Sequence, residues 1–405
     1  MTNTAVTSSI VAKETLAILK NKLSFSAGVN RDWEDEYTGN MARGYAPGAT
    51  INIRKPSRYT YRAGRIAVPQ ASVETTVPLT LSQGGADLNF TAFERTVSFP
   101  SRSVENKINA AVATVVNEID RQGLALAHTA TFNTVNPAGA LPNTQALSLQ
   151  IVTDANARLD EMAAPRDGER SLITNPRLNG ALIQGFAGLF NNPTKISKQY
   201  DRGMMVDSLG LSFAMDQNVD VHTNGTQVVA GTNVNGAGQT GAAITVVGLG
   251  GTITRGTVVT FPGVFAVNPQ SRVSTGVLAQ FVVTADLLAA AVSIPISPAL
   301  TPTGAFQNVT ASPTTGAPFL IVGAASTAYA TNIAYHRDAF TLAMVPMWKP
   351  EAGMGAKVSQ QSSDGFTVKV TDFYDGINDN AIMRIDVLFG WAATYPELAV
   401  KLYTV

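Results

Sequence analysis

The three histidines are the side chains best suited to acid–base or metal chemistry, yet their spacing favours neither. His128, His222 and His336 lie far apart, and none has a second histidine or a carboxylate at metal-ligand spacing on a helix. His336-Arg337-Asp338 has the first three letters of a kinase catalytic loop, but an apolar run stands where the downstream Asn is required. We therefore predict that this triplet is a turn between strands.

Other motifs that could carry chemistry are incomplete. The glycine-rich stretch Gly248–Thr257 lacks both the lysine and the following helix of a phosphate-binding loop, so it predicts a β-turn. Carboxylate pairs such as Asp154 with Asp160 have no apolar pocket pattern around them. The chain has no cysteine, which excludes disulfides, thiolate catalysis and sulfur-ligated metals. We predict no catalytic, metal or cofactor site and no enzymatic activity.

The basic run from Arg54 to Arg65 is the strongest candidate for an interaction site. Tyr59 and Tyr61 interleave with its cations, as in proteins that bind single-stranded nucleic acid. An exposed loop that pairs with an acidic patch of a neighbouring subunit fits the same residues, and the chain carries such a patch. The net charge of zero favours the protein contact. The candidate contact residues are Arg54, Lys55, Arg58, Arg62 and Arg65 in the basic run, with Asp32, Glu34, Asp35 and Glu36 in the acidic patch.

Composition points to surfaces that other proteins cover. Charged residues make up 14 % of the 405, against roughly 25 % in an ordinary soluble domain. Such a weakly charged surface suits extensive association, although an ordinary β-rich protein could share it. The sequence shows neither a secretory pattern nor an apolar run approaching the roughly 20 residues of a membrane span. We expect a protein made in a cytoplasm, without a membrane partner.

Helical patterning is clearest over Ser103–Thr129. Ser103 can cap the helix, and an apolar stripe with a 3.6-residue period follows. A second helix is predicted over Leu149–Ala163 and a third from Pro176 to Phe190, with a buried strand at Ser171–Thr174 between them. The stripe of the first helix is Val104, Ile108, Ala111, Val112, Val115, Ile119 and Leu126.

Strand patterning flanks these helices. Val73–Leu81 and Leu88–Phe99 alternate like the arms of a hairpin, with Gly84-Gly85 in its turn. Near the end, Met383, Ile385, Val387, Phe389 and Trp391 form the apolar face of a half-buried strand. Pro396 must interrupt this strand, because it cannot donate a backbone hydrogen bond. The following apolar run, Leu398–Tyr403, is expected to lie in the core.

The chain changes character over Thr223–Gly323. This stretch is rich in Thr, Val, Gly, Ala, Asn and Pro, and has few charges. Turn residues separate short strand-like runs, as expected for a small antiparallel barrel inserted into a host domain. The predicted strands are Thr226–Ala230, Ala243–Val247, Val258–Phe261, Leu278–Thr284 and Val292–Ile296.

The order of these features resembles the major capsid protein of tailed double-stranded DNA phages. More narrowly, it is similar to the coat protein of the short-tailed Salmonella phage type, whose axial domain carries an inserted β-barrel. Each stretch is weakly specific, but their order and spacing span nearly the whole chain. The stretches that carry the resemblance are Gly48–Pro56, Val206–Val219, Thr254–Asn268, Ala334–Met347 and Arg384–Val400.

The resemblance implies an α+β capsid fold and a function carried by surfaces. Copies of the chain would form pentamers and hexamers of an icosahedral shell, with a scaffolding protein, a portal protein and non-specifically held double-stranded DNA as partners. Assembly would take place in the host cytoplasm. A decoration or tail-tube subunit is the alternative. The expected divisions are an arm (1–44), an extended loop (45–85), a peripheral domain with the long helix (86–147), an axial domain (148–222 and 324–370), the inserted barrel (223–323) and closing peripheral strands (371–405).

Overall fold

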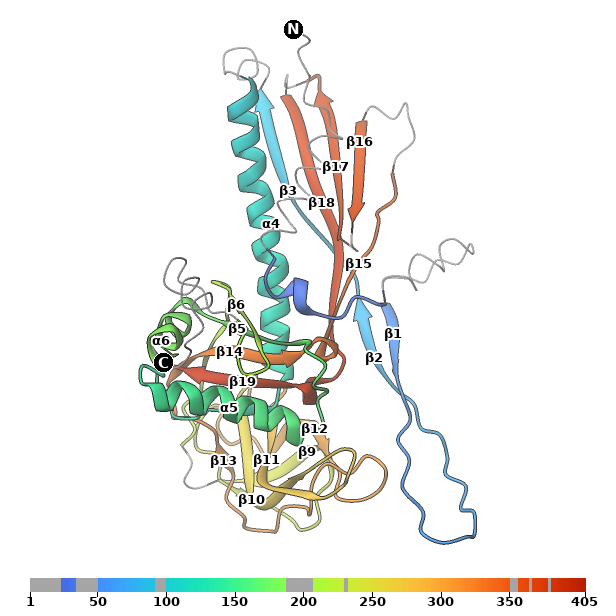
Figure 1. The fold of residues 1–405 in the computed structure, drawn as a ribbon, viewed down its shortest axis with the longest axis vertical. Coiled ribbons are helices and arrows are strands. Elements are labelled where there is room, and N and C mark those ends of the chain that lie inside the picture. Colours follow the sequence, from blue (N-terminus) through green and yellow to red (C-terminus); the bar gives the residue numbers. More distant parts are fainter. Residues whose placement is uncertain are drawn as a thin grey trace. The chain divides into compact units, whose positions relative to one another are not determined.

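The computed structural model describes residues 23–33, 50–91, 100–186, 207–228, 232–349, 356–363, 366–377 and 380–405. The fold is mixed α+β, and its strands outweigh its helices (Figure 1). The chain divides into two compact units, each made of segments distant in sequence. The first unit comprises Met1–Ile53, Val77–Gly123 and Thr341–Ala392, and the second comprises Arg54–Thr76, Leu124–Phe340 and Ala393–Val405.

The predicted helices are present. The long helix α4 covers Pro100–Ala130, and its described apolar positions from Ala111 to Ile119 are buried as the stripe requires. Helix α5 covers Gln145–Glu161 and begins at Thr144, whose hydroxyl accepts a hydrogen bond from the Leu147 N–H. Helix α6 covers Pro176–Phe186. The last residues of the predicted third helix, 187–190, lie outside the described residues.

The first unit is built on an antiparallel sheet in the order β15-β18-β17-β16, with β3 also paired to β18. Met383, Ile385, Val387 and Phe389 of β18 are buried and Trp391 is half-buried, so the predicted apolar face is confirmed. The strands are β3 (Ser82–Thr91), β15 (Phe340–Met344), β16 (Ala356–Ser363), β17 (Phe366–Asp375) and β18 (Asn380–Ala393).

The predicted turn at Gly84-Gly85 is wrong. Both glycines lie inside β3, and Gly85 is paired with Asp386 of β18. A Cβ at Gly85 would collide with the Ile385 carbonyl, so the glycine allows a close approach of two strands. The two arms of the expected hairpin belong to different sheets, because β2 pairs with β1 and β3 pairs with β18.

Further contacts in the first unit tie an early segment to α4. The Asp120 carboxylate is buried and accepts hydrogen bonds from the Ser24 N–H at 3.0 Å and the Ser26 N–H at 3.1 Å. Between these serines, the Phe25 ring stacks on Trp391 at 5.3 Å. The indole N–H of Trp391 donates to the carbonyl of Ile119 in α4. One polar anchor and one aromatic anchor therefore fix this segment.

The second unit contains a mixed sheet in the order β4-β19-β14-β5-β6, with β7 also on β14. Every residue of β19 is buried, so the prediction that this run lies in the core is confirmed. We expected β19 to close the peripheral domain together with β18; instead it pairs with β14 and β4, because the helical turn η3 (Pro396–Leu398) separates the two strands. The strands are β4 (Asn133–Val135), β5 (Arg170–Thr174), β6 (Ser212–Met215), β7 (Val221–Thr223), β14 (Ala328–His336) and β19 (Ala399–Thr404).

Helices α5 and α6 share a hydrophobic core with this sheet. The core draws on both helices and on β5, β14 and β19, so it joins residues more than 200 positions apart. Its buried members include Ile151, Val152, Leu159, Leu172, Leu178, Leu182, Phe186, Ala334, Val400 and Leu402.

A second sheet of this unit follows the order β13-β10-β11-β12-β9-β8, and all its pairs are antiparallel. It has its own hydrophobic core, centred on Phe261, Phe281 and Phe319. Four of the five predicted strands are confirmed. The predicted strand Thr226–Ala230 is wrong, because residues 226–228 form no strand and Asn233–Val234 takes the edge position. The strands are β8 (Asn233–Val234), β9 (Gly241–Val247), β10 (Val258–Val267), β11 (Ser274–Val283), β12 (Ser293–Leu300) and β13 (Leu320–Ile321).

The helices can be assessed for their ability to span a membrane. Among the described residues, none of the helices combines the length and the apolar character needed to cross a membrane.

Candidate assembly loop

The basic run lies at the base of a long loop. Strands β1 (Thr50–Lys55) and β2 (Thr75–Thr80) pair, and residues 56–74 join them without a helix or strand (Figure 1). Alternate residues of β1 are buried, because Ile51 and Ile53 pack with Leu79 in a small core. From Tyr61 to Glu74 every residue of the loop is exposed.

The loop is braced by its own side chains. Gln70 imitates a strand partner, since its amide accepts from the Thr60 N–H at 2.8 Å and donates to the Thr60 carbonyl at 2.7 Å. The hydroxyls of Ser57 and Ser72 hydrogen-bond across the loop at 2.7 Å. Near the tip, the Arg62 guanidinium donates to two carbonyls of its own loop. These bonds hold two extended segments together where the backbone forms no ladder.

The root of the loop is tied to the segment that interrupts the final strands. The Arg58 guanidinium donates to the Glu397 carboxylate at 3.1 Å, and the Lys55 ammonium lies 5.0 Å from the Tyr395 ring centroid. Burial lowers the pKa of Lys55 and Arg58 lowers it further, while Glu397 opposes both. Burial also raises the pKa of Tyr395, with Glu397 adding to the effect.

A third contact joins the loop to the sheet formed by β8–β13. Arg272, which precedes β11, donates to the Tyr59 carbonyl at 2.6 Å and to the Ala305 carbonyl at 3.3 Å. Arg272 holds a left-handed backbone conformation, with φ of 57°, in the turn between β10 and β11. The loop is therefore fixed at its root and exposed beyond it.

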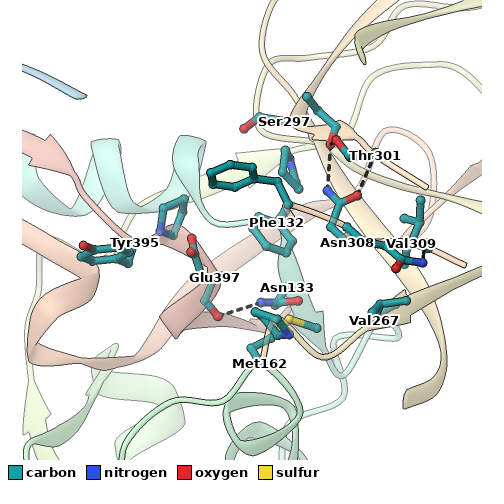
Figure 2. Close-up of a pocket in the computed structure, with 18 of the residues that line it drawn as sticks. Phe132, Asn133, Met162, Val267, Ser297, Thr301, Asn308, Val309, Tyr395 and Glu397 are labelled. Atoms are coloured by element: carbon teal, nitrogen blue, oxygen red, sulfur yellow. Dashed lines mark hydrogen bonds between the residues drawn. The ribbon is translucent and has the colours of Figure 1, made fainter. Parts of the chain in front are cut away.

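A cavity of about 440 Å³ lies beside this root (Figure 2). Tyr395 and Glu397 line one side of it, and Asn308 and Val309 line the other. Asn133 is buried between them and donates to the Glu397 carbonyl at 3.3 Å. The described lining contains no histidine, and its one carboxylate, Glu397, is engaged by Arg58.

The structure separates the predicted contact residues into distinct groups. Lys55 and Arg58 engage their own chain, and Arg54 faces Glu74 at 4.0 Å across the loop root. Arg62 folds back on the loop, and Arg65 is exposed. Asp32 donates its backbone N–H to the Asn30 side chain. Glu34, Asp35 and Glu36 lie outside the described residues.

Sequence reasoning missed the partners of this run. The sequence predicts only a break between strands at Pro396, and it assigns Tyr395, Glu397 and Arg272 no role beside the basic run. A charged residue next to a proline inside an otherwise apolar segment was the available signal for Glu397. No local pattern indicates Arg272, because its contact with Tyr59 spans 213 residues.

Two histidines that are distant in sequence meet in the second unit. The Nε2 atom of His128 lies 3.2 Å from Nδ1 of His222, and both rings are buried. His222 also lies 3.1 Å from the Thr257 hydroxyl. Burial lowers the pKa of His128 well below its ordinary value and that of His222 to about 4, so both rings are neutral at neutral pH.

His336 lies in another group, with Asp167 and Glu169, that has metal-ligand atoms in reach of one another. Its hydrogen bonds oppose metal binding. Nδ1 accepts the Asp338 N–H, so Nε2 carries the proton and donates to Asp167 at 3.0 Å. The triplet His336-Arg337-Asp338 enters a short helical turn between β14 and β15, which confirms the predicted turn. This hydrogen bond also lowers the pKa of Asp167.

Comparison with known proteins decides what kind of chain this is. The sequence model of the family described as "P22 coat protein - gene protein 5" matches residues 76–403. The chain belongs to the P22 coat protein family. As a member of this family it is a major capsid protein of tailed phages, with an α+β phage capsid fold, and it builds a multimeric shell in the virion. No curated protein matches this coat protein.

Solved structures similar to this coat protein include phage capsids. A chain of Mycobacterium phage Che8 has 11 % identity and a TM-score of 0.48, covering 94 % of this chain and 91 % of that one. The capsid of Cyanophage P-SCSP1u has 11 % identity and a TM-score of 0.42, with 88 % and 84 % covered. The virus-like particle from Pyrococcus furiosus has 9 % identity and a TM-score of 0.39, with 97 % of each chain covered.

Proposed function

We propose that this coat protein forms the pentamers and hexamers of an icosahedral shell, and that the loop of residues 56–74 lies on a neighbouring copy. The observation that carries the proposal is the exposed apolar surface of a loop that is nevertheless braced. Tyr61 is 94 % exposed and Ile66 is 83 % exposed, although the cross-loop bonds of Gln70 hold the segment in one shape. The exposed apolar residues of the loop are Tyr59, Tyr61, Ile66, Val68 and Val73.

Exposed apolar side chains on an ordered segment favour burial against a partner. Burying them gains about 25 cal/mol per Å² of apolar surface, and a loop whose shape is already fixed loses little entropy on docking. In a shell of identical copies, each subunit has other copies of the chain as its neighbours, so a second copy is the expected partner. Arg62 and Arg65 lie beside these apolar residues, so they are the cations of the basic run best placed to meet an acidic patch. The predicted acidic residues Asp32, Glu34, Asp35 and Glu36 remain our candidates for that patch.

We also propose that the sheet formed by β8–β13 is a closed barrel inserted into the second unit. The edge strand β8 exchanges backbone hydrogen bonds with the segment just before β13, the other edge strand. The Val234 N–H donates to the Ala317 carbonyl at 2.9 Å, and the Phe319 N–H donates to the Thr232 carbonyl at 3.0 Å. Closure leaves no free edge, which suits a protein that must associate only through chosen surfaces.

The remaining parts of the proposal follow from the capsid assignment. We infer a scaffolding protein and a portal protein as assembly partners, double-stranded DNA held non-specifically inside, and assembly in the host cytoplasm. The chain acts without catalysis. The divisions at 1–44, 45–85, 86–147, 148–222, 223–323 and 324–370 stay our working boundaries for its domains, and of 371–405 we keep in the peripheral domain only the part before β19, which pairs with β14 and β4. A decoration or tail-tube role is less well supported, because the family is one of coat proteins.

Particle formation tests the proposal. Purified wild-type protein should sediment as large closed particles, alone or with a scaffold, and electron micrographs should show shells. Ile66→Asp should reduce particle yield and leave the thermal unfolding of the subunit unchanged, since the side chain contacts solvent in the free chain. Ile66→Val is the matched control and should assemble normally. Wild-type protein that stays monomeric or dimeric under all conditions would refute shell formation, and normal assembly of Ile66→Asp would refute the role of the loop.

A further inference from the structure

Lys401 of β19 is a lysine buried without a carboxylate. Its relative exposure is 0 %, and its Nζ donates to the His128 carbonyl at 3.2 Å and the Gly256 carbonyl at 3.0 Å. A neutral amine has two N–H donors, and these two carbonyls satisfy both. An ammonium has a third donor, and no acceptor for it lies among the residues that the structure describes. The site therefore fits the neutral form of the lysine better than the charged form.

The surroundings of Lys401 join both sheets of the second unit. His128 lies in the last turn of α4, His222 lies in β7, and Gly256 precedes β10 of the other sheet. Gly256 has φ of 95° and faces the His128 ring so closely that a Cβ would collide with it. Thr257 completes the cluster by its contact with His222. The sheet of β8–β13 is thus bound to the sheet of β14 and β19 through groups that can take up protons.

The other charged and titratable groups nearby do not neutralise Lys401. Among the described residues, Arg255 adds positive charge at His128, and Asp286 opposes the positive charge at His222. Asp286 itself accepts the Arg255 N–H at 2.7 Å. The Tyr403 ring lies 5.9 Å from the Lys401 Nζ, and burial raises the pKa of its phenol, so it stays uncharged. The ring of Tyr329 in β14 stacks on the ring of Tyr403.

We propose that Lys401, His128 and His222 form a proton-sensitive latch that docks the sheet of β8–β13 onto the sheet of β14 and β19 and weakens that docking as the pH falls. The latch is a device of the subunit, independent of the loop proposed above for assembly. It operates because each proton added to the cluster creates a charge in a site built for neutral groups.

The direction of the effect follows from proton linkage. Burial lowers the pKa of Lys401 from 10.5 to about 7. Between these values an opened cluster, in which the lysine is hydrated, binds a proton that the docked cluster does not bind. Opening is therefore favoured as the pH falls through this window, by up to about tenfold per pH unit for one proton. Below about pH 7 both states are protonated at Lys401 and its contribution stops changing.

Other contacts across the same boundary provide a control that does not titrate. Gln280 of β11 accepts from the Thr134 N–H at 2.6 Å and donates to the Thr134 carbonyl at 3.0 Å. An amide side chain and a backbone group carry no proton equilibrium near neutral pH. Loss of Gln280 should therefore weaken docking at every pH without changing its pH dependence.

Hydrogen–deuterium exchange on the full-length subunit tests the latch. The exchange of β10 and β11 amides, corrected for intrinsic rates, is followed from about pH 7 to about pH 9. In the wild type, the corrected exchange rate should fall by up to about tenfold for each pH unit of increase. Lys401→Met, which keeps length and removes the charge, should abolish this dependence. Gln280→Ala should raise the exchange rate at every pH and keep the pH dependence of the wild type. A wild type without pH dependence, or an unchanged dependence in Lys401→Met, would overturn the proposal.

A second measurement covers failure of Lys401→Met to fold. In the wild-type subunit labelled with ¹³C at lysine Cε, one lysine other than Lys55, whose pKa burial also lowers, should titrate about three pH units below the ordinary value in NMR spectra. If all lysines other than Lys55 titrate together near their ordinary value, the latch does not exist.

Discussion

Arg58 and Glu397 lie 339 residues apart in sequence, and the guanidinium of the first donates to the carboxylate of the second at 3.1 Å. The pair fixes the root of the loop to the segment that separates β18 from β19. It also changes how the basic run should be tested. Arg58 already has a partner in its own chain, whereas Arg65 is exposed, so the two cannot serve the same purpose.

Charge reversal should distinguish these arginines. Arg58→Glu places two carboxylates together and should destabilise the loop root by about 1 kcal/mol, since the pair is only partly buried. The double change Arg58→Glu with Glu397→Arg should recover most of that loss. Arg65→Glu should leave subunit stability unchanged and lower particle yield, because Arg65 is exposed, whereas Arg62 bonds within its own loop. Thermal unfolding and sedimentation measure the two effects, and normal particle yield in Arg65→Glu would exclude this arginine from assembly contacts.

Arg170 and Arg166 offer a matched comparison on one carboxylate, Asp160. Arg170 is buried and also donates to the Pro165 carbonyl at 2.8 Å, whereas the Arg166 side chain is 72 % exposed. Arg170→Ala removes the bonds to Asp160 and Pro165 and leaves the buried Ala164 carbonyl without this donor, so it should cost about 1–3 kcal/mol. Arg166→Ala should cost below about 1 kcal/mol. Denaturant unfolding measures both, and equal losses would contradict the difference in burial.

The pKa of Asp160 provides a further check on the same site. The hydrogen bond from Arg166 lowers it most, burial opposes this, and Arg170 lowers it again. Because the folded state lowers this carboxyl pKa, its contribution to stability is present above the unfolded value and is lost as the pH falls through the folded value. Arg166→Ala should therefore reduce the amount of folding stability that is lost as the pH falls. Urea unfolding at several acidic pH values measures it, and an unchanged acid dependence would contradict the assignment.

Two glycines of α6 should respond to alanine in opposite directions. A Cβ at Gly180 meets nothing within 4 Å, so Gly180→Ala should stabilise the helix by about 0.5–1 kcal/mol. A Cβ at Gly185 would overlap the Ser148 side chain of α5, so Gly185→Ala should destabilise the unit by about 1–3 kcal/mol. Thermal unfolding measures both changes. Stabilisation by Gly185→Ala would mean that α5 and α6 are not packed as described.

Acid should act on His222 in a separate pH window. Burial lowers its pKa from 6.5 to about 4, and the charge of Lys401 adds to the effect, while Asn224 and Asp286 oppose it. The unfolded chain therefore binds a proton that the folded chain does not, and stability should fall between about pH 6.5 and about pH 4 by on the order of 2 kcal/mol. His222→Gln should show a shallower loss in urea unfolding. An equal loss in the variant would assign the acid sensitivity to other groups.

The sequence by itself determined the elements whose signals are local. The apolar stripe between Val104 and Ile119 predicts α4 because a 3.6-residue period has one structural explanation. The alternation from Met383 to Trp391 predicts β18 in the same way. Incomplete motifs excluded a phosphate loop and a kinase-like loop, since such sites need several residues at fixed spacing. The order of the weak motifs along the chain indicates a capsid protein.

Only the tertiary structure decided which elements pair and which side chains meet. A period of two shows that β18 and β19 are strands but carries no information about their partners, so the two fell into different sheets. Gly84-Gly85 indicated a turn because glycine favours turns, yet the close approach of Ile385 also requires glycine. Likewise the sequence shows Lys401 only as a single charged residue within the apolar run Leu398–Tyr403. Its burial beside His128 and His222 arises from packing among four segments, and no local pattern encodes such a meeting.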